Sequence, residues 1–240
     1  MPITRVEKFL ETDDLGIAHS LGIESGHLDD CVAEVNRRGI RGVFGSSVFG
    51  FKEDNLDFLN QLQGIRQVWF REIDLKDVAG LYSQKSLEYF GITTKRPAID
   101  YSCFTELRYI VWEPIKHDSG IEKLKYLESL DVWRYKTKNK SFADLRLPGS
   151  LRKLEFNWCN QDSINALPVL QNLEELQLHY CRNIRSLKGL SELAPNLKKL
   201  IVTRCANLES FQEALDMNLE HIYINVRGKE VASNSINRIR

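Results

Sequence analysis

The chain has 240 residues with 42% hydrophobic content, which is enough for an extended core, and its 33 lysines and arginines balance 33 aspartates and glutamates. A net charge of zero excludes a global field that would draw the protein to nucleic acid or to an anionic membrane, so any partner must be recognised locally. Five cysteines are too few for a small disulfide scaffold, and their odd number leaves at least one thiol unpaired.

The first 39 residues predict a cap and no targeting signal. Acidic residues follow Arg5 and Lys8 before any apolar stretch develops, which argues against a secretion signal. No run of eighteen apolar residues occurs, as a membrane helix would require. Leu28, Cys31, Val32 and Val35 fall on one helical stripe. We therefore expect a helical N-terminal cap over residues 1–39 and a cytoplasmic protein that does not contact membranes.

From residue 40 onward, the pattern apolar-x-x-apolar-x-apolar recurs at intervals of 20 to 25 residues. Alternation within each copy predicts a short strand with one buried face, and the rest of each interval is long enough to cross over to a parallel neighbour. Segments 54–62 and 162–170 show helix-like spacing, so short helices or turns are expected on the returns. The nine copies start at Ile40, Ile65, Leu87, Leu107, Leu127, Leu151, Leu173, Leu197 and Leu219.

This pattern resembles the leucine-rich-repeat family, whose consensus places an inward Asn or Cys at the ninth position. Cys159, Cys181 and Cys205 occupy that position, and we interpret them as small buried hydrophobes rather than as a metal site or disulfides. The resemblance implies an α/β leucine-rich-repeat solenoid, with a curved parallel sheet on the concave side and short helices or turns on the convex side. The solenoid is predicted for residues 40–226, followed by a C-terminal cap or tail, 227–240, that is polar and frays after a short capping turn.

The sequence contains no recognisable catalytic motif. GxxxxGK(S/T), HExxH, CxxC and GxSxG are all missing, and the five histidines lack the spacing of metal ligands. His179 and His221 are both expected on the concave side, two repeats and roughly 10 Å apart, which is too far for a shared metal. We predict no enzymatic activity, no catalytic residue, no cofactor and no metal. A hydrolase that uses His179 is the weakest alternative.

The residues between the buried strand positions are expected to face outward from the concave sheet. Aromatic residues and arginines concentrate binding energy at interfaces, so this surface predicts a protein-binding site. Phe44 is expected there as well. An alternative is that the rings stack on one another and only shield the sheet. The predicted partner-binding residues are Trp69, Arg71, Tyr89, Tyr109, Trp133, Arg134, Glu155, Trp158, His179, Tyr180, Arg204 and Tyr223.

The function predicted from these features is that of a non-enzymatic protein–protein interaction module. It is expected to be a monomer when free and to bind one protein partner through the concave sheet, as an inhibitor or a toxin-immunity protein. The alternative is an adaptor or scaffold that recruits a separate enzyme, which would hold two partners at once. Nucleic acid is not expected as a partner, because aromatic stacking platforms for bases work in a positively charged groove and the chain has no net positive charge.

Overall fold

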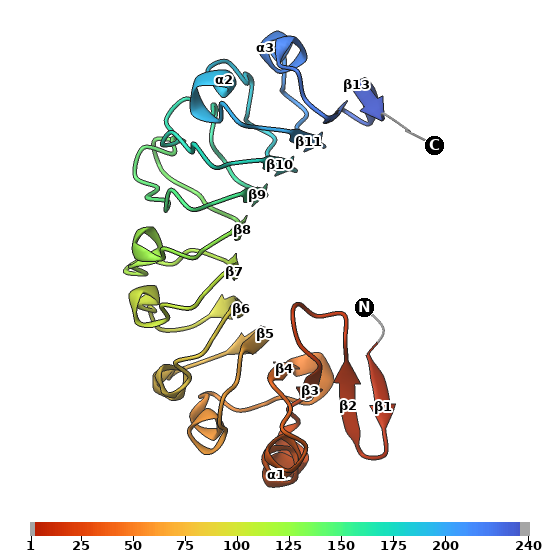
Figure 1. The fold of residues 1–240 in the computed structure, drawn as a ribbon, viewed down its shortest axis with the longest axis vertical. Helices are drawn as coiled ribbons and strands as arrows, with labels where there is room; N and C mark the ends of the chain where they lie inside the picture. The colour runs from red at the N-terminus through yellow and green to blue at the C-terminus, as the bar shows by residue number, and fades with distance from the viewer. Residues whose placement is uncertain (1–2, 236–240) are drawn as a thin grey trace. The chain divides into compact units, whose positions relative to one another are not determined.

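The computed structural model describes residues 3–235, and the chain divides into two compact units, residues 1–127 and 128–240. Within each unit the strands lie side by side in chain order (Figure 1). The first unit contains β1 (Thr4–Val6), β2 (Phe9–Thr12), β3 (Ser20–Gly22), β4 (Gly42–Ser46), β5 (Gln67–Asp74), β6 (Tyr89–Lys95) and β7 (Tyr109–Trp112). The second unit contains β8 (Ser129–Trp133), β9 (Lys153–Asn157), β10 (Glu175–His179), β11 (Lys199–Thr203), β12 (His221–Val226) and β13 (Lys229–Ser235).

The register of the parallel strands confirms the repeat pattern. Within each unit, the second apolar position of each repeat pairs directly with its counterpart in the next repeat, and all of these side chains are buried. Because side chains alternate along a strand, the residues between them share the opposite side of the strands, which we call the sheet face. The paired positions are Val43, Val68, Phe90 and Ile110 in the first unit, and Leu130, Leu154, Leu176, Leu200 and Ile222 in the second.

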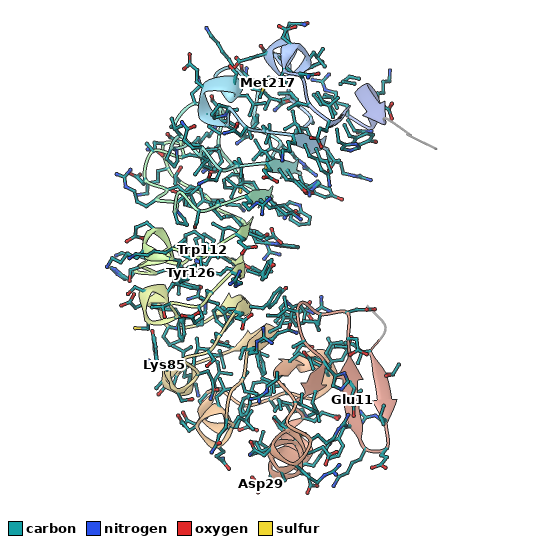
Figure 2. The ribbon with its side chains drawn as sticks, in the orientation of Figure 1. Glu11, Asp29, Lys85, Trp112, Tyr126 and Met217 are labelled. Atoms are coloured by element: carbon teal, nitrogen blue, oxygen red, sulfur yellow. The ribbon has the colours of Figure 1, made fainter. Side chains whose placement is uncertain are left out.

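The N-terminal cap is helical only in part, which corrects the prediction for residues 1–39. Its helix α1 (Leu28–Arg38) buries Cys31, Val32 and Val35 as expected. However, β1 and β2 form an antiparallel hairpin, and β3 runs parallel to β4 with α1 as the crossover. These strands cover the edge of β4, whose backbone groups would otherwise be unpaired. Figure 2 labels Glu11 on β2, a buried residue that binds Arg38 of α1.

The returns between strands are mostly turns and short 3-10 helices. The segment with helix-like spacing at 54–62 contains the 3-10 helix η3, whereas the one at 162–170 contains turns and no helix. No helix among residues 3–235 has the length and apolar character needed to cross a bilayer. The short helices are η1 (Ser25–His27), η2 (Ser47–Phe49), η3 (Asp57–Gln61), η4 (Ala79–Ser83), η5 (Tyr101–Cys103), η6 (Ile121–Lys123), α2 (Leu190–Leu193) and α3 (Gln212–Asp216).

The C-terminal segment is also more ordered than predicted. Residues 229–235 do not fray but form β13, which pairs antiparallel with β12. The two turn residues, Arg227 and Gly228, both have positive φ, 52° and 80°. Two residues of this conformation match the right-handed twist of the flanking strands, so the chain reverses tightly and covers the edge of β12. The last part of the predicted tail, residues 236–240, lies outside the described residues.

Candidate protein-binding surface

Four strands of the second unit are each followed by a residue with left-handed backbone. These residues are Arg134, Trp158, Tyr180 and Arg204, with φ between 54° and 57°. The N–H of each donates to a carbonyl at or next to the end of the following strand: Asn157, His179, Thr203 and Asn225, at 2.8 to 3.2 Å. Because all four backbones turn in the same way, their side chains emerge together at the carboxyl ends of the strands. We call them the strand-end row.

The strand-end row forms a continuous stack together with Trp133, the last residue of β8. The Trp158 ring lies between Trp133 at 5.2 Å and Tyr180 at 4.5 Å, measured between centroids, and it is nearly parallel to Tyr180. A guanidinium group closes each end, with Arg134 5.9 Å from the Trp133 ring and Arg204 5.5 Å from the Tyr180 ring. Trp158 remains 39% exposed. The aromatic stack of Trp133, Trp158 and Tyr180 is thus rigid and accessible.

A polar cluster on the sheet face fixes the first ring of this stack. The indole N–H of Trp133 donates to Asp131 at 2.7 Å. Asn157 donates from Nδ2 to Asp131 at 2.8 Å and to Glu155 at 2.9 Å. Burial and, after it, the negative charge of Glu155 raise the pKa of the Asp131 carboxyl to about 6. The predicted residue Glu155 therefore belongs to the support of the stack.

The histidine in this region is held by hydrogen bonds on both sides of its ring. His179 Nδ1 lies 2.6 Å from Thr203 Oγ1, and Nε2 lies 2.8 Å from Gln177 Oε1. Glu155 is farther away, at 3.7 Å from Nε2. The amide of Gln177 thus lies where a carboxylate would have to bind in order to activate the ring as a base. This arrangement orients His179 on the sheet face and does not favour the hydrolase alternative.

The cysteines at the ninth repeat position are buried free thiols, as the sequence predicted. The thiol of Cys181 donates to the carbonyl of Phe156 at 3.5 Å, and that of Cys205 donates to the carbonyl of Leu178 at 3.6 Å. The neighbouring Cys181 thiol and burial both raise the pKa of Cys159, so that group stays protonated. Among residues 3–235 no group of side chains has the arrangement of a metal site. Cys181 and Cys205 therefore each join their repeat to the preceding one.

The chain folds as a leucine-rich-repeat solenoid. Three observations agree with this assignment: the strands pair in register, apolar residues are buried at the repeat interval, and cysteines are buried at the ninth position of three successive repeats.

Comparison with known proteins gives limited matches, and no family model matches the chain. A segment of 120 residues, 49% of the chain, is 32% identical to Protein SUPPRESSOR OF npr1-1, CONSTITUTIVE 1 from Arabidopsis thaliana, and it spans 8% of that protein. A solved internalin (inlF) from Listeria monocytogenes aligns over 75% of this chain and 56% of its own, with 18% identity and a TM-score of 0.47.

The first unit of the solenoid contains a smaller group of predicted residues. The Arg71 guanidinium lies 5.0 Å from the Trp69 ring. Trp69 lies across Gly91 of the next strand, where the indole leaves no room for a Cβ. Tyr89 and Tyr109 stack at 6.4 Å. These four residues share the sheet face of the first unit, as predicted, and are separate in sequence from the aromatic stack.

The loop between β2 and β3 covers part of this second group. Gly16 lies so close to Tyr89 that a Cβ on it would approach the ring to 3.0 Å. The N–H groups of Ile17 and Ala18 donate to the Gln67 amide oxygen at 2.7 and 3.2 Å. Tyr89 is therefore contacted by its own chain, a contact that no pattern in the sequence indicates.

Two candidates depart from the expected arrangement. Phe44 is fully buried and packs edge-on against Phe49, because β3 continues the sheet beyond β4 and the cap covers this end. Tyr223 does lie on the sheet face, but its neighbours across the strands are Ile201 and Ser233. It is thus placed apart from the aromatic stack.

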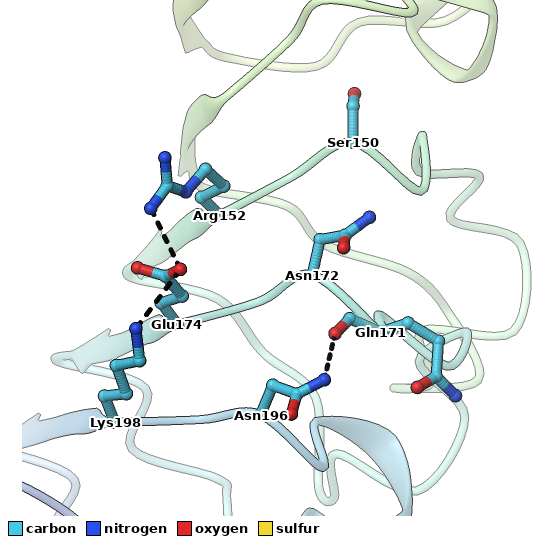
Figure 3. Close-up of a pocket in the computed structure, with 7 residues that line it drawn as sticks. All are labelled: Ser150, Arg152, Gln171, Asn172, Glu174, Asn196 and Lys198. Atoms are coloured by element: carbon cyan, nitrogen blue, oxygen red, sulfur yellow. Dashed lines mark hydrogen bonds and ion pairs between the residues drawn. The ribbon is translucent and has the colours of Figure 1, made fainter.

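At the amino ends of the same strands, charged side chains of opposite sign neutralise one another (Figure 3). Arg152 lies 2.9 Å from Glu174, which also lies 3.4 Å from Lys198. Below them, the side chain of Asn196 donates to the carbonyl of Gln171 at 2.8 Å. The shallow pocket among these residues is lined by groups that already satisfy one another, so it favours a structural role.

We did not predict this row of alternating charges from the sequence, although the sequence contains a signal for it. The second residue of successive repeats alternates in charge from the second copy to the last. Aligning the repeats by their leucines reveals the alternation directly. The residues are Arg66, Glu88, Arg108, Glu128, Arg152, Glu174, Lys198 and Glu220.

Proposed function

We propose that the chain is a non-enzymatic protein-binding module whose partner docks on the aromatic stack and strand-end row of the second unit. The observation that carries this proposal is the stack itself, in which an exposed tryptophan lies between two other rings and an arginine closes each end. Aromatic and arginine side chains dominate binding energies at protein interfaces. Stacking fixes their rotamers in advance, which reduces the entropy lost on binding.

The same observation favours a single partner. The predicted residues that come together in the second unit form one cluster, whereas those of the first unit are partly covered by the loop at Gly16. We therefore propose that the protein is a monomer that binds one partner and inhibits it, as a toxin-immunity protein does, and we place an adaptor role second. We also propose a cytoplasmic location, which five free thiols favour.

Affinity capture with the purified chain as bait tests this proposal. The Trp158→Ala variant should weaken capture of the partner by about 30-fold, since a central interface tryptophan contributes about 2 kcal/mol or more. Tyr126→Ala is the matched control, because Tyr126 is an aromatic residue that is 55% exposed in the return before β8 (Figure 2). Unchanged capture by a folded Trp158→Ala variant would place the binding surface elsewhere.

Light scattering of the purified complex separates the two roles. A complex of one chain with one partner, in which the partner's activity is lost, supports inhibition. A ternary complex in which two partners remain bound and active supports the adaptor.

A further inference from the structure

The loop between β2 and β3, residues 13–19, lies against the sheet face of the first unit (Figure 1). The N–H groups of Ile17 and Ala18 donate to the side-chain oxygen of Gln67 at 2.7 and 3.2 Å. Gln67 is completely buried, so water cannot replace these hydrogen bonds while the loop stays in place. We call this segment the strap, because it crosses the sheet face and contacts Tyr89.

A histidine at the end of the strap bridges two carboxylates. His19 Nδ1 lies 2.7 Å from Asp13, and Nε2 lies 2.9 Å from Glu11. An ionised carboxylate only accepts hydrogen bonds, so both ring nitrogens must donate, and both carry hydrogen only in the protonated ring. A neutral ring directs a nitrogen lone pair at one of the two carboxylate oxygens. The closed strap therefore selects the positively charged form of His19.

The charged groups that face His19 come from β2, the strap and α1. Glu11 of β2 is 5% exposed. The hydrogen bond from Arg38 of α1 is the largest cause that lowers the pKa of Glu11, and the bond from His19 adds to it, so Glu11 stays ionised. The strap contributes Asp13 and Asp14, whereas the side chains of β1 that line the same recess are uncharged. Since Asp13 is 82% exposed at its side chain, the contact with buried Glu11 is the stronger one.

We propose that the strap is a pH-dependent cover for the aromatic group of the first unit. It is closed over Tyr89 while His19 is protonated, and its open population increases once that proton is lost. Histidine is the side chain that changes charge between about pH 5 and 8, so the strap responds near neutral pH. Opening exposes Tyr89, which stacks on Tyr109. The inference is independent of the proposed function, because the surface proposed there lies in the second unit.

Amide hydrogen exchange of the whole chain, followed by NMR, tests this inference. The protection factors of the Ile17 and Ala18 N–H groups, corrected for the intrinsic pH dependence of exchange, report how often the strap opens. Between about pH 5.5 and about pH 8.5 we expect them to fall about fivefold, because one charge-assisted hydrogen bond is lost. The nuclear Overhauser effect between Gly16 Hα and the Tyr89 ring should weaken in parallel.

Two variants assign the effect to its residue. His19→Gln has a neutral side chain at both pH values, and its protection factors should be low and equal at both. His221→Gln is the matched control, since it removes a histidine from the second unit, and it should retain the fivefold change of the unaltered chain. Circular dichroism verifies that both variants fold.

Three results would overturn the inference. Equal protection at the two pH values in the unaltered chain would show that the strap does not respond to pH. An unchanged pH dependence in His19→Gln would assign the response to another group. Loss of protection with a persistent contact between Gly16 and Tyr89 would show that the strap loosens without uncovering the ring.

Discussion

Left-handed backbone at residues other than glycine is the feature that places the strand-end row. This conformation costs roughly 1–2 kcal/mol for an L-residue, because Cβ approaches the carbonyl oxygen. In the second unit, the hydrogen bond from each N–H to the next strand offsets part of that cost. Glu72, which follows the main part of β5 in the first unit, adopts the same conformation with φ of 55°. The turn therefore belongs to the repeat and not to the identity of the side chain.

Glu72 allows this backbone cost to be measured without disturbing the stack, because its side chain is exposed. Glu72→Gly should leave the free energy of unfolding unchanged or raise it by up to about 1 kcal/mol, since glycine adopts positive φ readily. Glu72→Val should lower it by about 1–2 kcal/mol, because a branched Cβ increases the clash. Urea unfolding of the three proteins gives the comparison. Equal stability of the glycine and valine variants would show that the residue is not held in this conformation.

Asp131 should give the protein a pH dependence in the acidic range. Its pKa of about 6 in the folded protein exceeds the value of about 4 in an unfolded chain, so folding favours the protonated carboxyl. Its contribution to the free energy of unfolding is thus fully present below about pH 4 and is lost as the pH rises through about 6, by at most about 3 kcal/mol. Carboxyl NMR titration measures this pKa. Glu155→Gln should lower it, and a wild-type value near 4 would contradict the role of burial.

At the scale of elements, one buried ion pair joins the segments that follow β6 and β7. Arg96 and Asp118 have 0% and 1% exposed side chains, and both guanidinium contacts measure 2.7 Å. Asp118 also accepts from the N–H of Ile99 at 3.0 Å and from the indole of Trp112 at 2.9 Å. Burial alone would raise the pKa of Asp118, but the hydrogen bonds from Arg96, Ile99 and Trp112 and the charge of Arg96 together outweigh burial, and the pKa is lowered. The pair thus holds an irregular return in one conformation.

Removing the buried carboxylate should be far more costly than removing an exposed one. Asp118→Ala leaves Arg96 charged and unpaired, and we expect a loss of about 3–5 kcal/mol in the free energy of unfolding. Asp54→Ala is the control, because Asp54 pairs with Lys76 at 2.9 Å on the surface, and it should cost less than about 1 kcal/mol. Denaturant titration compares the variants. Similar losses would mean that the buried pair does not organise the return.

At the scale of each unit, antiparallel strands cover the edges of the parallel sheet. The β1–β2 hairpin and β3 precede β4, and β13 covers β12. An uncovered edge presents unpaired N–H and C=O groups that recruit other chains. The outermost strand at the N-terminal end, β1, is only three residues long, and a short edge strand offers few groups for pairing, which favours the monomer on which a one-to-one inhibitor depends.

Opening the C-terminal edge should change the association state. Gly228 has φ of 80°, so Gly228→Val strains the turn between β12 and β13 by about 1–2 kcal/mol and favours release of β13. We expect sedimentation velocity to show larger species as the concentration rises, whereas the unaltered chain stays monomeric. Lys229→Val, outside the turn, provides the control for added apolar surface. A monomeric Gly228→Val variant would indicate that β13 does not protect the edge.

The sequence by itself determined the repeat, the strand register and the buried apolar positions of the repeat. Strand alternation has a period of two, and a one-residue shift would expose every leucine, so positions such as Leu154 and Leu176 could be assigned from local pattern alone. The same holds for Cys159, Cys181 and Cys205, because their place in the repeat fixes their burial.

Only the tertiary structure decided which exposed residues meet. Trp133 is the last residue of its strand and Trp158 follows the end of the next, and they stack because of the left-handed turn at Trp158, which no local propensity indicates. The loop that contacts Tyr89 and the strands that cover both edges depend on contacts between residues far apart in sequence.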